Sequence, residues 1–232
     1  MSRGRIWAVL PAAGVGRRMG GPVPKQYLSL AGRPVIARTL DRLLAVPGVA
    51  GAVVALSPED DHWDAVGYRH DKPVQRVPGG AERCDSVLSA LRWLCEQGAG
   101  REYALVHDAV RPCVTLEEVQ RLIATAADDQ GGLLGFPVRD TLKRDDGAGH
   151  VAGTTDRDGL WHALTPQLFP VAALAQALER AAEAGLTVTD DASAMEAAGV
   201  HPRLVPGEAT NIKITRPTDL ALAEAILQAQ EH

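Results

Sequence analysis

The chain carries the stretch Leu10-Pro11-Ala12-Ala13-Gly14-Val15-Gly16-Arg17-Arg18-Met19-Gly20, and Pro24-Lys25-Gln26-Tyr27 follows after three further residues. The apolar run that precedes it, residues 6–10, predicts a buried strand that ends where the small residues begin. Gly14 and Gly16 lack Cβ atoms, so the backbone amides of this loop can approach phosphate oxygens closely. Three cations stand in the same loop, namely Arg17, Arg18 and Lys25. The loop therefore predicts a site for a triphosphate or a pyrophosphate group.

The loop matches neither of the two common phosphate-binding motifs. The dinucleotide fingerprint requires Gly or Ala where Met19 stands, and Gly20 comes one position too late. The Walker motif requires Gly-Lys-Ser/Thr, which the stretch lacks. We therefore expect a third kind of nucleotide site, in which Arg17 is a solvated neighbour of Arg18.

Composition restricts the class of protein further. The 232 residues carry a net charge of -5, which disfavours a general nucleic-acid binder. Only 4% of the residues are aromatic, so aliphatic side chains must fill the core. The three cysteines show no Cys-x-x-Cys spacing, which disfavours a disulfide framework or structural zinc. With no apolar run of membrane-spanning length and no signal region in residues 1–5, we expect a cytoplasmic protein that binds neither membranes nor nucleic acids.

Strand and helix signals alternate along the chain, which predicts an α/β sheet layered with helices. One helix is expected to begin at Pro34, another after the glycine-rich residues 79–86, and a third at the capping box formed by Thr115 and Glu118. Later helices are expected over residues 171–184, over a short segment from Thr189 to Gly199, and from Pro217 onward. The expected strands are residues 6–10, 49–56, 74–77, 103–106, 161–164, 203–205 and 211–215.

The pattern changes between Phe136 and Leu160. Residues 141–144 and 151–155 flank Asp145-Asp146-Gly147, which predicts a hairpin with too few apolar residues to be core. A two-stranded ribbon is marginally stable alone in water. We therefore expect residues 137–160 to form a projecting arm that packs against a second copy of the chain in a homodimer.

Polar residues follow the strand expected at residues 103–106, at the edge where open α/β sheets place ligands. Asp108 is the first candidate for a carboxylate linked to Mg²⁺, and a helix cap or an ion pair with Arg111 is the alternative. His107 could polarise Asp108, although packing or hydrogen bonding is the more common role of a histidine at a strand end.

Seven segments, in order and with fitting spacing, together resemble one family, the 2-C-methyl-D-erythritol 4-phosphate cytidylyltransferases of non-mevalonate isoprenoid biosynthesis. The segments are residues 11–19, 24–27, 107–112, 139–141, 165–167, 189–193 and 211–215. The resemblance extends from Ile6 to Leu227 and implies a three-layer Rossmann-like nucleotidyltransferase fold with a mostly parallel mixed sheet. It also implies a single domain over residues 1–232, with 137–160 as the dimerisation arm.

The implied reaction joins CTP to methylerythritol phosphate and releases pyrophosphate with the help of Mg²⁺. The substrate phosphate attacks the α-phosphate of CTP, so no protein nucleophile is needed, and the chain shows no defensible Ser/His/Asp arrangement. By resemblance, Arg18 and Lys25 stabilise the transition state, while Arg157 and Lys213 position methylerythritol phosphate. The nucleotide-binding residues implied are Ala12, Ala13, Gly14, Gly16, Gly80 and Ser86. The residues implied around the second substrate are Asp108, which also lies near the metal, Arg111, Thr141 and Thr189.

Three other hypotheses remain open from the sequence. A cytidylyltransferase for another polyol phosphate, such as ribitol 5-phosphate, shares much of the loop chemistry. A nicotinamide dehydrogenase is disfavoured by Met19, and a non-catalytic dimeric sensor would bind CTP without turnover.

Overall fold

The computed structural model describes residues 4–14 and 23–230, and a mixed sheet runs through their centre. Its seven strands lie in the order β11-β7-β10-β6-β1-β4-β5. The strands are β1 (Ile6–Pro11), β4 (Val49–Leu56), β5 (Val74–Pro78), β6 (Tyr103–Val106), β7 (Gly132–Pro137), β10 (Trp161–Pro170) and β11 (Arg203–Pro206). Only β10 pairs antiparallel with its neighbours β6 and β7. The remaining pairs are parallel, which confirms the predicted mostly parallel mixed sheet.

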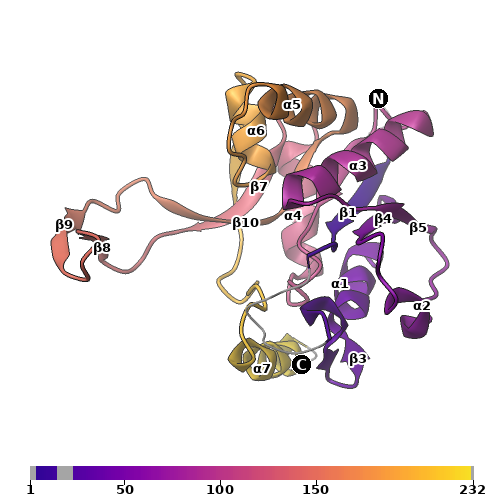
Figure 1. Ribbon diagram of the computed structural model, residues 1–232, viewed down its shortest axis with the longest axis horizontal. Coiled ribbons are helices and arrows are strands. Elements are labelled where there is room, and N and C mark those ends of the chain that lie inside the picture. Colours follow the sequence, from indigo (N-terminus) through magenta and orange to yellow (C-terminus); the bar gives the residue numbers. More distant parts are fainter. Residues whose placement is uncertain (1–3, 15–22, 231–232) are drawn as a thin grey trace.

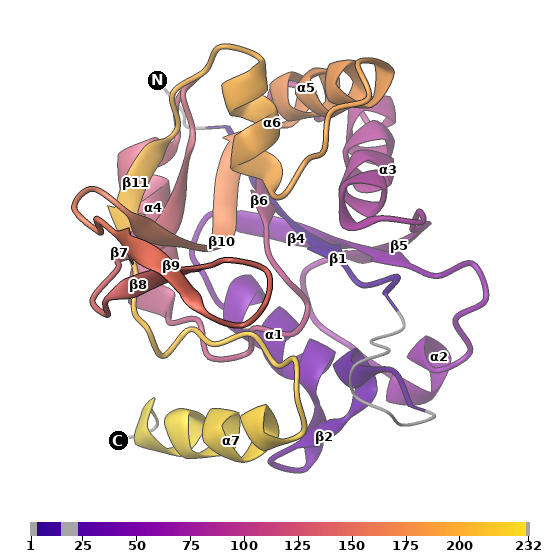
Figure 2. The ribbon, with the colours of Figure 1, turned by 60° about the vertical axis from the view of Figure 1, so that its left-hand side comes forward.

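Helices cover both faces of this sheet and make the three layers seen in Figures 1 and 2. One face carries α1 (Val35–Leu44), α2 (Trp63–Val66) and α4 (Leu116–Ala126), and the other carries α3 (Arg83–Glu96), α5 (Val171–Glu183) and α6 (Asp191–Ala197). Strand β1 shows why both faces must be covered. Leu10 packs into the core beneath α1 and α4, whereas Val9 packs into the core beneath α3 and α5. A strand that is buried on both sides is apolar throughout, as the run at residues 6–10 is.

A third cluster holds the C-terminal helix α7 (Thr218–Gln230) against the carboxyl edge of the sheet. Leu227 and Ala223 of α7 pack with Leu30 of the small β2 (Ser29–Leu30) and β3 (Arg33–Pro34) pair and with Val110 after β6. The helix therefore supports the β2–β3 pair and the loop that follows β6.

The structure differs from the expected strands at three places. Strand β7 was not among the predicted strands. Residues 211–215 form no strand, because Ile214 buries its side chain in the α7 cluster and makes a single backbone bond to the carbonyl of Val110. Strand β10 continues beyond the predicted 161–164 to Pro170, since its second half pairs with β6 in the middle of the sheet. The capping box of Thr115 and Glu118 is confirmed at the start of α4.

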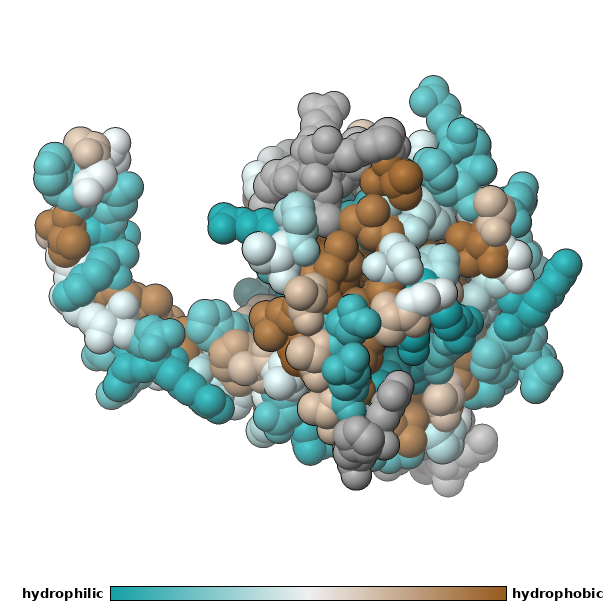
Figure 3. Space-filling view, turned by 90° about the horizontal axis from the view of Figure 1, so that it is seen from below, coloured by the Kyte–Doolittle hydropathy of each residue, from teal (hydrophilic) through white to brown (hydrophobic). Residues whose placement is uncertain are grey.

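The predicted arm is confirmed as a projecting hairpin. It leaves the sheet at the end of β7, forms β8 (Leu142–Asp145) and β9 (Val151–Thr155), and returns at the start of β10. Figure 1 shows this hairpin far from the helices, and the space-filling view in Figure 3 shows an open concavity between it and the body. Val151 in the hairpin is 65% exposed. Within residues 4–14 and 23–230, no helix combines the length and apolarity that crossing a membrane requires.

Candidate active site

The carboxyl edge of the sheet contains a cleft in two adjoining parts. The first part lies between the loops that follow β1, β5 and β6. The second reaches the start of α6 through Thr189 and Asp190. Three charged residues line both parts, namely Arg83, Asp108 and Lys213.

The predicted nucleotide-binding residues that the structure describes gather in the first part. They are Ala12, Ala13, Gly14, Gly80 and Ser86, and Lys25 lines the same part. The predicted residues Gly16 and Arg18 lie outside the described residues.

Close packing between two loops shapes the first part of the cleft. A Cβ on Gly79 would lie 2.4 Å from the Cβ of Ala13, and a Cβ on Gly80 would lie 2.2 Å from that of Asp85. Ser86 fixes the same turn, because its Oγ accepts the N–H of Gly80 at 3.1 Å. By contrast, a Cβ on Gly14 would meet nothing within 4 Å. Gly79 thus lets the two loops touch, Gly80 lets its own turn close onto the start of α3, and Gly14 leaves open space in front of the backbone.

Gln26 connects the Lys25 turn to the loop after β1. Lys25 and Gln26 belong to the 3-10 turn η2 (Lys25–Tyr27), and the buried Gln26 side chain donates from Nε2 to the carbonyl of Ala12 at 2.9 Å. The N–H of Ala12 in turn donates to the carbonyl of Ala55 in β4 at 2.8 Å. The position of Lys25 is therefore tied to the central strands of the sheet.

Asp108 is the electrostatic centre of the cleft. Its Oδ1 accepts Arg83 Nε at 3.0 Å, and its Oδ2 accepts Arg111 Nε at 3.2 Å and Lys213 Nζ at 2.9 Å. Burial raises the pKa of this carboxyl, but Arg83, Lys213 and Arg111 outweigh that effect and hold its pKa well below the usual range. Asp108 is thus a stable anion held by three cations. The ion pair with Arg111 that was the alternative for Asp108 does form, as one of these three.

Arg83 carries a second buried carboxylate on its other side. Its Nη2 lies 2.9 Å from Oδ2 of Asp191, which is fully buried at the start of α6. Burial lowers the pKa of Arg83 and the two carboxylates raise it, with a net rise. Burial also raises the pKa of Asp191, and the nearby Arg83 only partly offsets this rise.

His107 supports Asp108 from behind. A backbone carbonyl can only accept, so Nε2 of His107 donates to the carbonyl of Arg111 at 3.0 Å, and Nδ1 is left to accept the Thr165 hydroxyl at 3.0 Å. The Thr165 Oγ1 accepts the Asp108 N–H at 3.1 Å. Burial lowers the pKa of His107 to about 4, so the ring is neutral at pH 7. His107 is therefore a packed, hydrogen-bonded histidine that orients the Asp108 backbone through Thr165.

The loop that was expected to be a strand at residues 211–215 still delivers Lys213 to the cleft. Arg111 Nη1 donates to the carbonyl of Asn211 at 2.6 Å, and Asn211 Nδ2 donates to the carbonyl of Thr165 at 2.8 Å. Two hydrogen bonds thus replace a strand ladder as the anchor of this segment.

Thr189 lines the second part of the cleft, as predicted, but the N-cap of α6 is the neighbouring Asp190. The Asp190 side chain accepts the N–H of Ser193 and also accepts Gln167 Nε2 at 2.8 Å. Thr189 is therefore not itself the cap.

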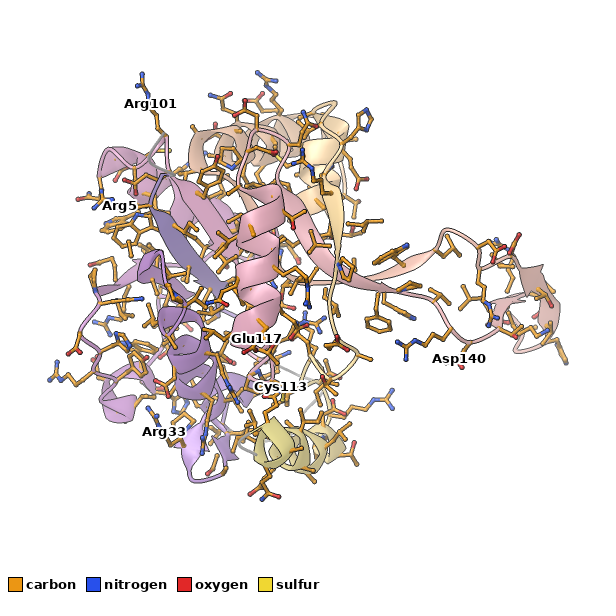
Figure 4. All side chains as sticks on the ribbon, turned by 180° about the vertical axis from the view of Figure 1, so that it is seen from behind. Arg5, Arg33, Arg101, Cys113, Glu117 and Asp140 are labelled. Carbon is orange, nitrogen blue, oxygen red and sulfur yellow. The ribbon has the colours of Figure 1, made fainter. Side chains whose placement is uncertain are left out.

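Two predicted residues are not brought to the cleft of their own chain. Thr141 and Arg157 lie in the arm, both exposed, and Arg157 donates to the carbonyl of Arg139. Figure 4 shows Asp140, the neighbour of Thr141, on the arm and far from Cys113 on the body. Neither side chain lines either part of the cleft of its own chain.

Sequence reasoning missed three residues of this arrangement. Arg83, Gln26 and Thr165 lie inside motifs that the sequence identified, yet none was given a role. The available signal for Arg83 was its position at the start of a helix after a glycine turn, where a side chain faces the carboxyl edge of the sheet. Nothing local in the sequence predicted its two carboxylate partners, which lie 25 and 108 positions away.

A glycine turn and a group of cations at the carboxyl edge of a mostly parallel sheet are typical of an α/β enzyme that acts on phosphorylated substrates. The family model of 2-C-methyl-D-erythritol 4-phosphate cytidylyltransferase matches residues 6–229. This chain therefore belongs to the 2-C-methyl-D-erythritol 4-phosphate cytidylyltransferase family.

Individual relatives and solved structures agree with this family. The 2-C-methyl-D-erythritol 4-phosphate cytidylyltransferase of Halorhodospira halophila is 58% identical over 98% of this chain and 96% of its own length. That of Aeromonas hydrophila is 52% identical over 97% of this chain and 90% of its own length. A crystal structure of 4-diphosphocytidyl-2C-methyl-D-erythritol synthase superposes with a TM-score of 0.85 at 36% identity, covering 98% of this chain and all of the other. The crystal structure of the Francisella tularensis 2-C-methyl-D-erythritol 4-phosphate cytidylyltransferase superposes with a TM-score of 0.82 at 32% identity, covering 96% of this chain and 99% of the other.

Proposed function

We propose that this chain transfers the cytidylyl group of CTP to 2-C-methyl-D-erythritol 4-phosphate in non-mevalonate isoprenoid biosynthesis. The products are 4-diphosphocytidyl-2-C-methyl-D-erythritol and pyrophosphate. The observation that carries the proposal is the two-part cleft, in which Arg83, Asp108 and Lys213 line both parts. A transfer between two phosphorylated substrates needs two adjoining sites with charged groups at their junction.

The first part of the cleft is assigned to CTP. In this proposal the backbone of Ala12, Ala13 and Gly14 contacts the nucleotide, and the Gly80 turn held by Ser86 closes the opposite wall. Selection of a pyrimidine over a purine is part of this proposal.

The second part is assigned to methylerythritol phosphate, with Arg111, Thr189 and Lys213 around it. The phosphate oxygen of this substrate attacks the α-phosphorus of CTP, a new P–O bond forms, and the bond to the leaving pyrophosphate breaks. Lys25 and Arg18 are assigned to the charge that develops on the α-phosphate oxygens, where one donor is worth about 3 kcal/mol of transition-state stabilisation. Lys213, 38% exposed and bonded to Asp108, is placed to hold the attacking phosphate.

The donor set at Asp108 fits Mg²⁺ bound mainly through substrate phosphates, the usual mode for this ion. A carboxylate offers about four lone-pair sites. Arg83 uses one on Oδ1, and Arg111 and Lys213 use both on Oδ2, so one on Oδ1 remains for a metal. No group of three or more His, Cys, Asp or Glu side chains that could hold a metal occurs in residues 4–14 and 23–230. When bound, Mg²⁺ would neutralise phosphate charge.

The arm is proposed to complete the site of a second copy in a homodimer. Thr141 and Arg157 are assigned to methylerythritol phosphate, yet they lie outside both parts of the cleft of their own chain. The exposed hairpin and the concavity beside it (Figure 3) support an arrangement in which each arm embraces the partner. In this proposal residues 1–232 are one cytidylyltransferase domain, and residues 137–160 are its dimerisation arm.

A cytoplasmic location is part of the proposal. It is supported by the cysteines Cys84, Cys95 and Cys113, all of which are free thiols.

The test is a pyrophosphate-release assay that crosses CTP, UTP and ATP with methylerythritol phosphate and ribitol 5-phosphate. We expect release with CTP and methylerythritol phosphate, dependent on Mg²⁺. Faster release with ribitol 5-phosphate would assign the chain to another polyol phosphate, and CTP binding without release would make it a sensor.

A further inference from the structure

Arg83 occupies a position that the reaction as described above does not use. It is the first residue of α3, and its guanidinium lies between Asp108, after β6, and Asp191, at the start of α6. Through Nε it donates to Asp108 Oδ1 at 3.0 Å, and through Nη2 it donates to Asp191 Oδ2 at 2.9 Å. Its side chain is 27% exposed and lines both parts of the cleft.

Asp191 is the unusual member of this group. It lines neither part of the cleft, it is fully buried, and its Oδ1 has no hydrogen-bond partner among the described residues. A buried carboxylate is costly unless it is paired. Arg83 supplies its ion pair within residues 4–14 and 23–230. The arrangement makes sense if Asp191 serves to hold Arg83 from behind.

We propose that Arg83 is a positioning residue that fixes the orientation of the Asp108 carboxylate, and that Asp191 is its anchor. With Oδ1 of Asp108 held by Arg83, Oδ2 faces Arg111 and Lys213 at the junction of the two parts. The carboxylate cannot turn without breaking one of these contacts. The inference rests on the proposed function, because it assigns Arg83 to the alignment of the same reacting groups.

The proposal depends on the shape of the arginine side chain and not only on its charge. A planar guanidinium donates in two directions from fixed positions, whereas an ammonium is a point charge on a flexible stem. Lysine at position 83 would therefore keep the charge but could not bridge Asp108 and Asp191 in the same way.

The kinetic test compares Arg83→Lys and Arg83→Ala with Arg92→Lys. The exposed Arg92 lies on the same helix and pairs with the half-buried Glu179 away from the cleft, so it is the matched control. We expect Arg83→Lys to lower kcat by about 10-fold or more while the Kd for CTP changes less than about 3-fold. Addition of guanidinium ions should restore part of the kcat of Arg83→Ala. Wild-type kcat in Arg83→Lys, or loss of CTP affinity alone, would overturn the proposal.

Asp191→Asn is the second variant and preserves side-chain volume. We expect a smaller loss of kcat than in Arg83→Lys, and the double variant should be no slower than Arg83→Lys alone, because both changes act through one contact. If the kcat losses of the two single variants multiply in the double variant, Asp191 acts independently of Arg83, and the anchor role is overturned.

A crystal structure of Arg83→Lys separates this inference from the proposed function. The positioning role predicts that the Asp108 carboxylate turns away from the wild-type orientation, whichever reaction the enzyme catalyses. An unchanged Asp108 would contradict the inference even if the wild type releases pyrophosphate from CTP. If the wild type shows no such release, the proposed function fails, and the orientation of Asp108 still decides the positioning role.

Discussion

Acidification from pH 7 to pH 5 should destabilise the fold through His107. The ring is fully buried, and its Nδ1 accepts the Thr165 hydroxyl in the neutral state. A proton on Nδ1 would require the Thr165 hydroxyl to turn from donor to acceptor, and it would add charge to a site already occupied by Arg83 and Arg111. Burial therefore lowers the pKa of His107 from 6.5 to about 4.

The size of the effect follows from linkage. Because the folded-state pKa is lower than the unfolded-state pKa, the unfolded chain takes up the proton first, and stability falls as the pH drops from 6.5 toward 4. Each tenfold difference in proton affinity is worth about 1.4 kcal/mol, so the full loss is about 3 kcal/mol. At pH 5 the loss should be about 2 kcal/mol.

Urea unfolding at fixed protein concentration, from pH 7 down to pH 5, measures this loss, with His107→Gln as the control. Glutamine keeps a donor for the Arg111 carbonyl but does not titrate. Both proteins contain Asp108 and Asp191, so the contributions of these residues cancel when the free energy of unfolding of the variant is subtracted from that of the wild type. Asp108, with its lowered pKa, loses its contribution only below 3.8.

A His107→Gln variant whose stability falls as steeply as that of the wild type would refute this reasoning. NMR of the His107 ring gives a second readout that does not need the variant. The ring should stay neutral at pH 5.5, and a midpoint near 6.5 in the folded protein would also refute the account.

Three further predictions concern the cleft and the arm. Gly79→Ala should weaken CTP binding by about tenfold or more in calorimetry, because the new Cβ would lie 2.4 Å from that of Ala13, whereas Gly100→Ala, whose Cβ meets nothing closer than 3.8 Å, should not. Equal affinities would contradict the close packing of the loops. Lys25→Ala should lower kcat by about 100-fold with a much smaller change in the Kd for CTP, and a loss confined to binding would contradict its role. Equal mixtures of Lys25→Ala and Arg157→Ala subunits should regain up to about a quarter of wild-type activity after exchange, since only a mixed dimer with shared sites contains one intact site. No recovery would show that both residues act within one chain.

The sequence predicted those parts of the fold that local patterns determine. The strands at residues 6–10 and 49–56 are continuous apolar runs because both faces of the sheet are covered, and the start of α4 follows from a capping box within four residues. The arm was predictable because a hairpin with few apolar residues cannot belong to the core.

Features that depend on distant partners were not predictable in this way. Residues 211–215 resemble a strand in composition, but contacts with α7 and Val110 hold them as a loop. The second half of β10 contains Pro166 in a cis peptide bond, a residue that locally argues against a strand. The role of Arg83 depends on Asp108 and Asp191, which come from two other elements. In each case the deciding contact joins residues that lie far apart in the sequence.

The charged cleft at the carboxyl edge should hold a reacting α-phosphate between its two parts, and a crystal structure with CTP and Mg²⁺ would test this expectation. Cytosine should lie beside the Gly80 turn, with the α-phosphate within hydrogen-bond distance of Lys25 and facing Lys213. A triphosphate bound away from Lys25, or a nucleotide lodged outside the cleft lined by Ala13 and Asp108, would contradict it.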